Sequence, residues 1–292
     1  MTLCKGIIPA ILTPFDKDEE VDYGKVREHV RRMLDAGVHG IFALGTNGEF
    51  YALSEPEKFK IVETVLDEVN GKVPVYAGSG EIATRTVIRL NKGFKAMGVD
   101  AVSVITPYFV NPTQHELYEH FKRIALESEI PVILYNLPMR THVNLEAETV
   151  ARLAEVDGII GIKDSSGKMD LTKAYIESAS DKFAVMGGND SLILDTLIAG
   201  GTGAVAATCN VIPEILTQIY NHFVAGNLDE ARVWQNKVDA LRADFALGTA
   251  PGVIKVQAAA AGFRLGESRM PILFDNEGVV NTIYENFKRN YR

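Results

Sequence analysis

Short, almost wholly apolar runs alternate along the chain with longer stretches in which apolar residues recur every three or four positions. The short runs are bounded by glycines and polar turns, which is typical of strands that are covered on both faces in a parallel sheet. The sequence therefore predicts eight buried strands. Their ranges are Gly6–Thr13, Gly40–Gly45, Val73–Gly78, Ala101–Thr106, Val132–Asn136, Ile159–Lys163, Phe183–Gly187 and Gly203–Thr208.

The stretches between these runs have the apolar spacing of amphipathic helices. Several are followed by a glycine, as at Gly37, Gly98 and Gly226, and glycine suits the left-handed residue that often ends a helix. The predicted helices are Asp22–Ala36, Glu55–Val69, Thr84–Met97, Gln114–Glu127, Leu145–Glu155, Leu171–Ser178, Ser191–Ala199 and Pro213–Ala225.

Eight alternating strand and helix units predict an α/β protein with a (β/α)8 TIM barrel, and a doubly wound open sheet is the alternative. Further helical pattern follows, from Leu228 through Phe263 and again over Val279–Lys288, so we expect a C-terminal helical extension. The chain then divides into a barrel over residues 1–226 and an extension over residues 227–292. We expect the extension to pack on the barrel or on another subunit, within one compact unit.

Composition limits the classes of function. Hydrophobic residues make up 47% and charged residues 23%, as in soluble globular proteins, and no apolar run approaches the roughly 20 residues that span a bilayer. The formal net charge of −8 opposes binding to a phosphate backbone, so we expect no nucleic-acid partner. The first residues lack the pattern of a secretory signal, and we expect a cytoplasmic protein. Cys4 and Cys209 lack metal-site spacing, which predicts two ordinary thiols and no zinc site.

A lysine ends the sixth predicted strand, in the segment Gly161-Ile162-Lys163-Asp164. In a barrel enzyme, the carboxyl ends of the strands carry the active site. An ammonium group is costly to bury without a partner, and only the neutral amine attacks a carbonyl carbon to form an imine. Lys163 is therefore a candidate nucleophile. The alternative, which the local pattern favours at least as much, is a lysine whose side chain extends to solvent.

Polar side chains also follow the second and fifth predicted strands. Thr46, Asn47 and Gly48 form a glycine-rich turn whose backbone can approach a small anion. Tyr135 can transfer a proton, and Arg140 can hold a carboxylate at two points. Taken separately, these residues fit a tight turn, core packing and a surface ion pair at least as well. Their shared position with the lysine at one rim of the predicted barrel favours a functional site.

Three motifs occur in order along the chain: Gly45-Thr46-Asn47-Gly48-Glu49, Tyr135-Asn136-Leu137-Pro138 and Gly161-Ile162-Lys163-Asp164. They resemble the G-[ST]-[TX]-G-E loop, the Y-N-x-P strand end and the G-[IL]-K-[DE] segment of the dihydrodipicolinate synthase and N-acetylneuraminate lyase family. The resemblance extends over nearly the whole chain. It implies a (β/α)8 barrel with a helical extension, a homotetramer built as a dimer of tight dimers, and neither a metal nor an organic cofactor.

The resemblance also implies roles for individual residues. Lys163 is the imine-forming nucleophile, Tyr135 the proton donor and acceptor, and Thr46 a relay hydroxyl beside it. The carboxylate of a 2-oxo acid substrate binds at Asn47, and Gly48 belongs to the same substrate-binding turn.

Other positions match or depart from the family pattern. Val205 matches a position whose backbone carbonyl lines the pocket. Synthases carry a second tyrosine, donated across the dimer interface, where this chain has Phe109, and usually a second threonine where it has Asn47. Arg140, by contrast, resembles the synthase arginine that binds the carboxylate of aspartate semialdehyde, which sialic-acid lyases tend to lack.

The leading hypothesis is therefore a class I aldolase-type lyase or synthase that forms a lysine imine with pyruvate or a related 2-oxo acid. A 2-keto-3-deoxy sugar acid aldolase or dehydratase, or an N-acetylneuraminate lyase-like enzyme, is the alternative among enzymes, because Phe109 cannot relay a proton. A barrel that binds a 2-oxo acid as a sensor is the alternative from another class, since a fold does not fix a function.

Overall fold

The computed structural model describes residues 3–178, 180 and 182–291 of the 292-residue chain. Residues 1 and 2, which belong to the segment expected to lack a secretory signal, lie outside this part. Eight strands form one parallel sheet in the order β1-β8-β7-β6-β5-β4-β3-β2. Their bounds are β1 Gly6–Pro9, β2 Ile41–Ala43, β3 Val75–Gly78, β4 Ala101–Ile105, β5 Val132–Asn136, β6 Ile159–Asp164, β7 Ala184–Gly187 and β8 Gly203–Ala206.

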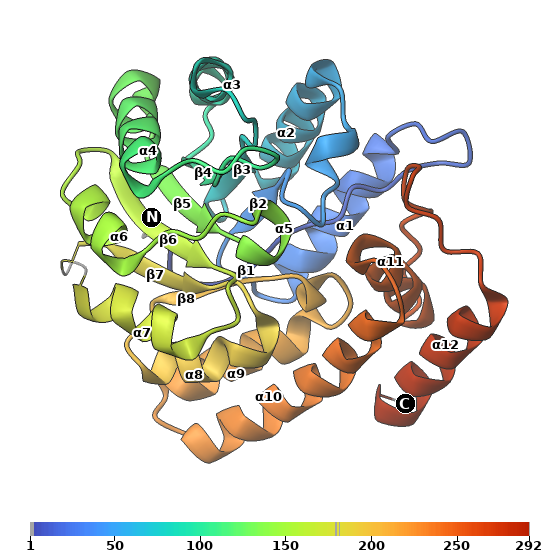
Figure 1. Ribbon diagram of the computed structural model, residues 1–292. Helices are drawn as coiled ribbons and strands as arrows, with labels where there is room; N and C mark the ends of the chain where they lie inside the picture. The colour runs from blue at the N-terminus through green and yellow to red at the C-terminus, as the bar shows by residue number, and fades with distance from the viewer. Residues whose placement is uncertain (1–2, 179, 181, 292) are drawn as a thin grey trace.

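The sheet closes on itself between its first two strands. An isolated parallel bridge joins Ala10 to Phe42, and the backbone N–H of Ile11 donates to the carbonyl oxygen of Phe42 at 2.9 Å. The N–H of His39 donates to the carbonyl oxygen of Ile7 at 2.8 Å, further along the same seam. The closed sheet confirms the predicted (β/α)8 TIM barrel and excludes the open doubly wound sheet (Figure 1).

Helices alternate with the strands and surround the barrel (Figure 1). Left-handed backbone at Gly37, Gly98 and Gly226, with φ of +75°, +92° and +78°, confirms the glycine helix ends predicted from the sequence. At the start of helix α2, Glu55–Val69, a capping box joins Ser54 and Glu57. The helices are α1 Tyr23–Asp35, α2 Glu55–Val69, α3 Thr84–Met97, α4 Gln114–Ser128, α6 Ala147–Ala154, α7 Met169–Ser178, α8 Ile193–Ile198 and α9 Pro213–Val224.

Short elements at the strand ends shorten several of the predicted strands and helices. The predicted first strand, which would reach Thr13, ends at Pro9. Beyond it the Asn210 side chain replaces the strand ladder, because it accepts from the Leu12 N–H and donates to the Ala10 carbonyl. The short elements are the 3-10 turns η1 Phe50–Ala52, η2 Asp190–Leu192 and η3 Thr208–Asn210, and the one-turn helix α5 Pro138–Thr141.

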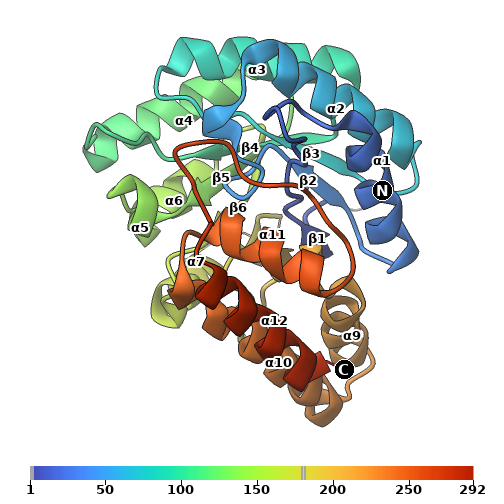
Figure 2. The ribbon, with the colours of Figure 1, turned by 90° about the vertical axis from the view of Figure 1, so that its right-hand side faces the viewer.

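The extension is not the continuous helical stretch predicted from Leu228 through Phe263. It comprises α10 Leu228–Arg242, the 3-10 segment η4 Ala243–Leu247, α11 Ala250–Ala260 and α12 Glu277–Tyr291. The chain turns at Gly248, where an added Cβ atom would lie 2.4 Å from the Phe274 ring, so the packing requires glycine there. Helix α10 packs on α9, and α12 packs on α11 (Figure 2).

Apolar side chains fill two buried regions. The larger one lies between the strands and the surrounding helices and extends under the C-terminal helices as far as Phe287. The smaller one occupies the barrel interior, where it includes Ile8, Phe42, Tyr76 and Met186. Among the described residues, no helix combines the length and apolar character needed to cross a bilayer.

A buried ion pair joins the barrel to the extension. The Glu49 carboxylate, in the turn after β2, is fully buried, and the ammonium nitrogen of Lys255 on α11 lies 2.8 Å from its Oε1. The backbone N–H of Arg269 donates to the other carboxylate oxygen of Glu49 at 3.1 Å. The Lys255 ammonium also donates to the Glu267 carbonyl oxygen at 2.8 Å. Burial lowers the pKa of Lys255, against the opposite effect of Glu49. The pair therefore holds the turn after β2 against α11.

We expect Lys255→Met to lower the free energy of unfolding by about 3–5 kcal/mol, because it leaves the Glu49 carboxylate buried without a cation. Glu49→Gln should cost less, because burial already favours the neutral amine of Lys255. The double variant, which lacks both charges, should recover most of the loss. Urea unfolding at neutral pH measures these differences, and a Lys255→Met loss below about 1 kcal/mol would contradict the importance given to this pair.

Candidate active site

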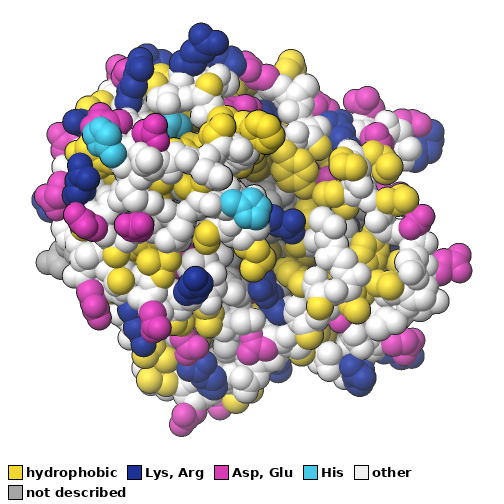
Figure 3. Space-filling model, viewed as in Figure 1, with side chains coloured by type: hydrophobic (Ala, Val, Ile, Leu, Met, Phe, Trp, Pro, Cys, Tyr) yellow, Lys and Arg dark blue, Asp and Glu magenta, His cyan; other side chains and the backbone are white. Residues whose placement is uncertain are grey.

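A cavity of about 600 Å³ opens at the carboxyl ends of the strands. Its walls come from the segments that follow the barrel strands and from the extension, between Arg242 and Ile272. Figure 3 shows the molecule hollowed on this side, with hydrophobic side chains gathered around the hollow and lysine or arginine side chains beside them. Volume and position are typical of a small-molecule site in a barrel enzyme.

Lys163 lies in the cavity wall near the end of β6, with 5% of its surface exposed. Its ammonium nitrogen is 4.0 Å from the centre of the Tyr135 ring and 5.2 Å from that of Phe42. Within the described part of the chain, it has neither a carboxylate partner nor a hydrogen bond. An amine held at a cavity wall without a partner is suited to react with a carbonyl compound.

The side chain of Lys163 passes close to a glycine of the seventh strand end. A Cβ atom added to Gly188 would lie 3.1 Å from Lys163 Cε and 2.0 Å from Ser165 Oγ. The Gly188 N–H donates to the Asp164 carbonyl at 2.7 Å, which fixes the two strand ends together. Glycine at this position therefore leaves the space that the lysine side chain occupies.

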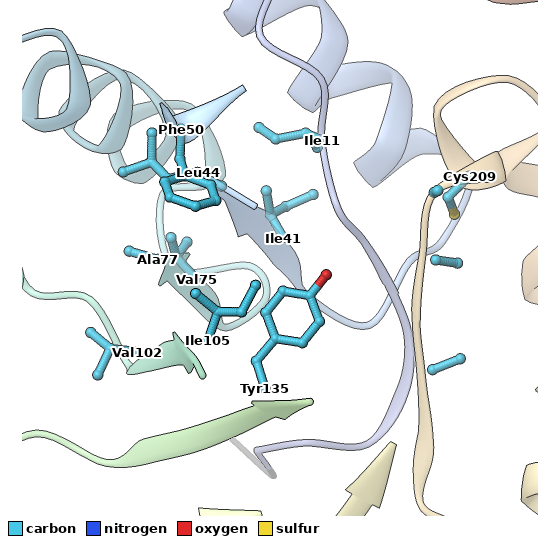
Figure 4. Close-up of a cluster of buried hydrophobic side chains, with 14 of the residues drawn as sticks. Ile11, Ile41, Leu44, Phe50, Val75, Ala77, Val102, Ile105, Tyr135 and Cys209 are labelled. Carbon is cyan, nitrogen blue, oxygen red and sulfur yellow. The ribbon is translucent and has the colours of Figure 1, made fainter. Parts of the chain in front are cut away.

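A pair of hydroxyl groups lies beside the lysine. Strands β5 and β6 place Tyr135 directly opposite Lys163 in their register. The Tyr135 ring is buried and extends from β5 among apolar side chains that include Ile105 and Leu44 (Figure 4). Its hydroxyl lies 3.2 Å from the hydroxyl of Thr46. The structure therefore brings together the amine, the phenol and the second hydroxyl expected from the sequence.

The turn after β2 only partly faces the cavity. Asn47 lines the cavity, as predicted for a substrate-binding residue. Gly48 does not line it, because its carbonyl oxygen accepts a hydrogen bond from Thr13 Oγ1 at 2.6 Å on the barrel side of the turn. An added Cβ atom at Gly48 would lie 3.0 Å from the Ile11 carbonyl oxygen. Gly48 thus shapes the turn that carries Asn47, and its own part in substrate binding stays a prediction.

Asp164, which follows the lysine, is occupied by structural hydrogen bonds. Its carboxylate accepts from the Ser166 N–H at 3.0 Å, the Ser166 hydroxyl at 2.9 Å and the Thr172 hydroxyl at 2.6 Å. The Asn136 amide donates to it at 3.3 Å. The carboxylate therefore holds the loop after β6 against the end of β5 instead of pairing with Lys163.

Arg140 lies on α5, exposed, and lines the outer part of the cavity. Its guanidinium has no ion pair within the described residues. It lies close enough to Tyr51, another lining residue, to lower the pKa of that phenol, although burial dominates and raises the pKa to about 12. Arg140 is therefore free to bind an anion at the cavity mouth.

The two remaining candidates differ in where they lie. Val205, from β8, lines the cavity as expected and is 5% exposed. Phe109 does not line the cavity of its own chain: its ring is 94% exposed, and its backbone is left-handed with φ of +72°. The preceding residue, Tyr108, does line the cavity.

The sequence analysis did not identify the outer wall of the cavity. Arg242, Phe245, Thr249 and Pro251, all from the extension, line it together with the barrel residues. A hydrophobic pattern predicts that α10 packs on the barrel, but it does not indicate which residues beyond the helix end reach a cavity. The glycine and proline that interrupt helix in this region were the available signal.

The charged side chains that line the cavity are Lys163, Arg140 and Arg242, and the lining residues include no aspartate, glutamate or histidine. Elsewhere among the described residues, no group of three or more acidic, histidine or cysteine side chains is arranged to hold a metal ion. The cavity is therefore electrostatically suited to anions although the whole chain carries a net charge of −8.

The model of the dihydrodipicolinate synthetase family matches residues 3–287. A 4-hydroxy-tetrahydrodipicolinate synthase from Methanopyrus kandleri is 39% identical over 270 residues, which cover 92% of this chain and 90% of that protein. The crystal structure of a dihydrodipicolinate synthase from Bacillus anthracis superposes with a TM-score of 0.96 at 32% identity and covers 100% of both chains. That of the chloride-inhibited Acinetobacter baumannii synthase, complexed with pyruvate, has a TM-score of 0.94 at 33% identity and covers 98% of both chains.

These matches span both the barrel and the extension. The chain belongs to the dihydrodipicolinate synthetase family and is a lyase of the class I aldolase type.

Proposed function

We propose that this enzyme forms an imine between Lys163 and pyruvate, or a related 2-oxo acid, and makes or breaks a carbon–carbon bond at the neighbouring carbon. The observation that carries the proposal is the buried Lys163 amine beside the hydroxyl pair of Tyr135 and Thr46. The Acinetobacter baumannii synthase binds pyruvate in its crystal structure, and this supports the same ligand here.

In the condensing direction, the neutral amine of Lys163 adds to the carbonyl carbon of pyruvate, and loss of water gives the imine. A proton leaves the methyl carbon, and the electron pair of the broken C–H bond forms the carbon–carbon double bond of the enamine. The enamine carbon attacks an aldehyde carbon, so that a carbon–carbon bond forms and the aldehyde oxygen takes a proton. Water then hydrolyses the imine, which releases a 4-hydroxy-2-oxo acid and restores the amine.

The surrounding residues take their roles from their positions. Tyr135 exchanges protons with the substrate, and Thr46 extends that exchange through the 3.2 Å contact between their hydroxyls. Asn47 binds the carboxylate next to the imine, and the backbone of Val205 forms the facing wall. Arg140 binds the carboxylate of the second substrate at the cavity mouth.

Phe109 favours a second candidate function within the same chemistry. A phenylalanine cannot supply the hydroxyl that family synthases donate between subunits. An aldolase or dehydratase acting on 2-keto-3-deoxy sugar acids, or an N-acetylneuraminate lyase-like enzyme, is therefore the alternative to a biosynthetic synthase. A sensor without turnover fits less well, because ligand binding alone does not require the hydroxyl pair beside the lysine.

The proposal includes a cytoplasmic homotetramer, arranged as a dimer of dimers. Phe109 supports an assembly, because its exposed ring does not line the cavity of its own chain and is suited to contact a second subunit. The scheme requires no metal or organic cofactor, because the lysine imine itself accepts the electron pair.

Lys163→Ala and Lys163→Met should abolish the covalent adduct that borohydride traps from enzyme and pyruvate. Both variants should keep the free energy of unfolding within about 1 kcal/mol of the parent, because the lysine has no ion pair or hydrogen bond to lose among the described residues. Intact mass and urea unfolding give the two readouts. Lys168→Ala, which removes an exposed lysine of the same loop, is the matched control and should still form the adduct. An adduct on a Lys163 variant would place the nucleophile elsewhere.

Gly188→Ala should slow adduct formation by about tenfold, because the new methyl group would lie 3.1 Å from Lys163 Cε and the lysine side chain must shift to make room. Adding Ser165→Gly removes the 2.0 Å contact with the serine but leaves the contact with Lys163 Cε. The double variant should therefore recover stability without recovering the rate. Timed borohydride trapping and thermal unfolding separate these effects, and an unchanged rate in Gly188→Ala would show that the lysine position does not depend on this glycine.

Wild-type enzyme should condense pyruvate with aspartate semialdehyde poorly, and Phe109→Tyr should raise that turnover by about 10²-fold. Asn47→Thr tests the other departure from the synthase pattern, and the double variant tests whether the two gains are non-additive. Phe109→Leu serves as the control that changes the ring without adding a hydroxyl. Wild-type turnover already near about 10 s⁻¹ would refute the prediction and favour the biosynthetic synthase.

A further inference from the structure

Arg242 belongs to the wall of the cavity that the extension provides. It is the last residue of α10, it is partly buried, and it lines the cavity. Its guanidinium carbon lies 4.8 Å from the centre of the Phe245 ring, which lines the same wall. Stacking on an aromatic ring holds the plane of a guanidinium and leaves its N–H edge available for an anion.

An ordinary explanation accounts for part of this position. A cation in the last turn of a helix is favoured by the helix dipole. The dipole does not, however, require the side chain to line a cavity. Arg232, on the same helix, has the usual surface arrangement, with a guanidinium nitrogen 2.7 Å from an Asp195 carboxylate oxygen. Arg242 has no carboxylate partner within the described residues.

The charges of the cavity exceed what a single 2-oxo acid can neutralise. Among the described residues, three cationic side chains line it and no acidic side chain does. In the proposed scheme, the nitrogen of Lys163 becomes the imine nitrogen. The carboxylate beside the imine is bound at the turn around Asn47. Two guanidinium groups then remain: Arg140 on the barrel side and Arg242 on the extension side.

We propose that Arg242, held against Phe245, forms with Arg140 a distal anion subsite for the second substrate. This inference rests on the proposed imine function and specifies its substrate class. The second substrate is an aldehyde that carries a carboxylate or phosphate group remote from its carbonyl carbon. The condensation product is correspondingly a 2-oxo acid with an anionic group at its far end.

The other lining residues bear on this class too. Leu137, Met139, Phe245 and Ile272 give part of the cavity an apolar surface, beside polar lining residues that include Tyr51, Asn189 and Thr249. No lining carboxylate is present to pair with an ammonium group. A semialdehyde without an amino group should therefore bind better than aspartate semialdehyde.

Matched pairs of 2-oxo acids test the subsite without requiring turnover. Each pair has the same chain length and differs only in the distal carboxylate, as in 2-oxoadipate against 2-oxohexanoate, with the corresponding five-carbon and seven-carbon pairs. The concentration that gives half-maximal borohydride trapping reports the affinity of each acid. In the wild type, at least one diacid should bind about tenfold or more tighter than its monoacid, because a guanidinium–carboxylate contact adds roughly that factor.

Variants of Arg242 then test whether this residue produces the preference for diacids over monoacids. Arg242→Gln should remove about tenfold of the diacid preference and leave the trapping of pyruvate and of the monoacids unchanged. Arg242→Lys, which keeps the charge but not the planar fork, should retain part of it. Arg232→Gln is the matched control on the same helix and should behave as wild type.

Condensation assays identify the anion. Succinate semialdehyde, glyceraldehyde 3-phosphate and neutral glyceraldehyde are compared as partners of pyruvate in the wild type and in Arg242→Gln. A lower KM for either anionic aldehyde than for glyceraldehyde, lost in the variant, supports the subsite, and the better of the two shows whether it takes a carboxylate or a phosphate.

The inference and the proposed function fail in different ways. If pyruvate itself gives no trapped adduct, the imine function is wrong. If pyruvate is trapped but no diacid is preferred over its monoacid, the distal subsite is wrong and the imine function stands. An equal loss for diacids and monoacids in Arg242→Gln would also overturn the subsite, because it would show that Arg242 acts only on the shape of the wall.

Discussion

A buried ion pair joins the two parts of the chain that enclose the active site, although they are distant in sequence. Glu49 and Lys255 have side-chain exposures of 0% and 3%, so neither charge can lose the other without a large desolvation cost. Glu49 directly follows the turn that carries Thr46, and Lys255 lies one turn beyond Pro251 on the wall of the cavity. Together with the bonds of Arg269 to Glu57 and Ala52, the pair therefore holds the extension over the reactive corner of the barrel, which Lys163, Tyr135 and Thr46 form.

The reactive corner itself combines opposite requirements. The lysine must be buried enough to exclude competing partners, yet it must remain accessible to a small acid. The structure meets both requirements by surrounding the amine with aromatic rings and by engaging the adjacent carboxylate of Asp164 in hydrogen bonds to Ser166 and Thr172. The acidic residue of the motif thus supports the loop, while the amine keeps its reactivity for the substrate.

Much of the fold and of this corner could be predicted because both follow from local patterns. Apolar runs separated by amphipathic stretches predict the barrel, and a lysine at a strand end lies at the functional rim whatever the later packing. The position of Gly48 could not be predicted, because it depends on Thr13, from a distant part of the chain. The role of Arg242 in the wall depends on the packing of α10 on α9, and the sequence around it shows only a helix end.

The part of the cavity wall that the extension provides lies in a different stretch of the chain from Lys163, Tyr135 and Thr46. Substitutions after α10 would therefore change the distal subsite proposed for the second substrate, while the strand ends keep the same covalent chemistry. A comparison restricted to residues 242–272 should group relatives by substrate more faithfully than a comparison of whole chains, and a graft of this segment between relatives offers a route to new condensation products.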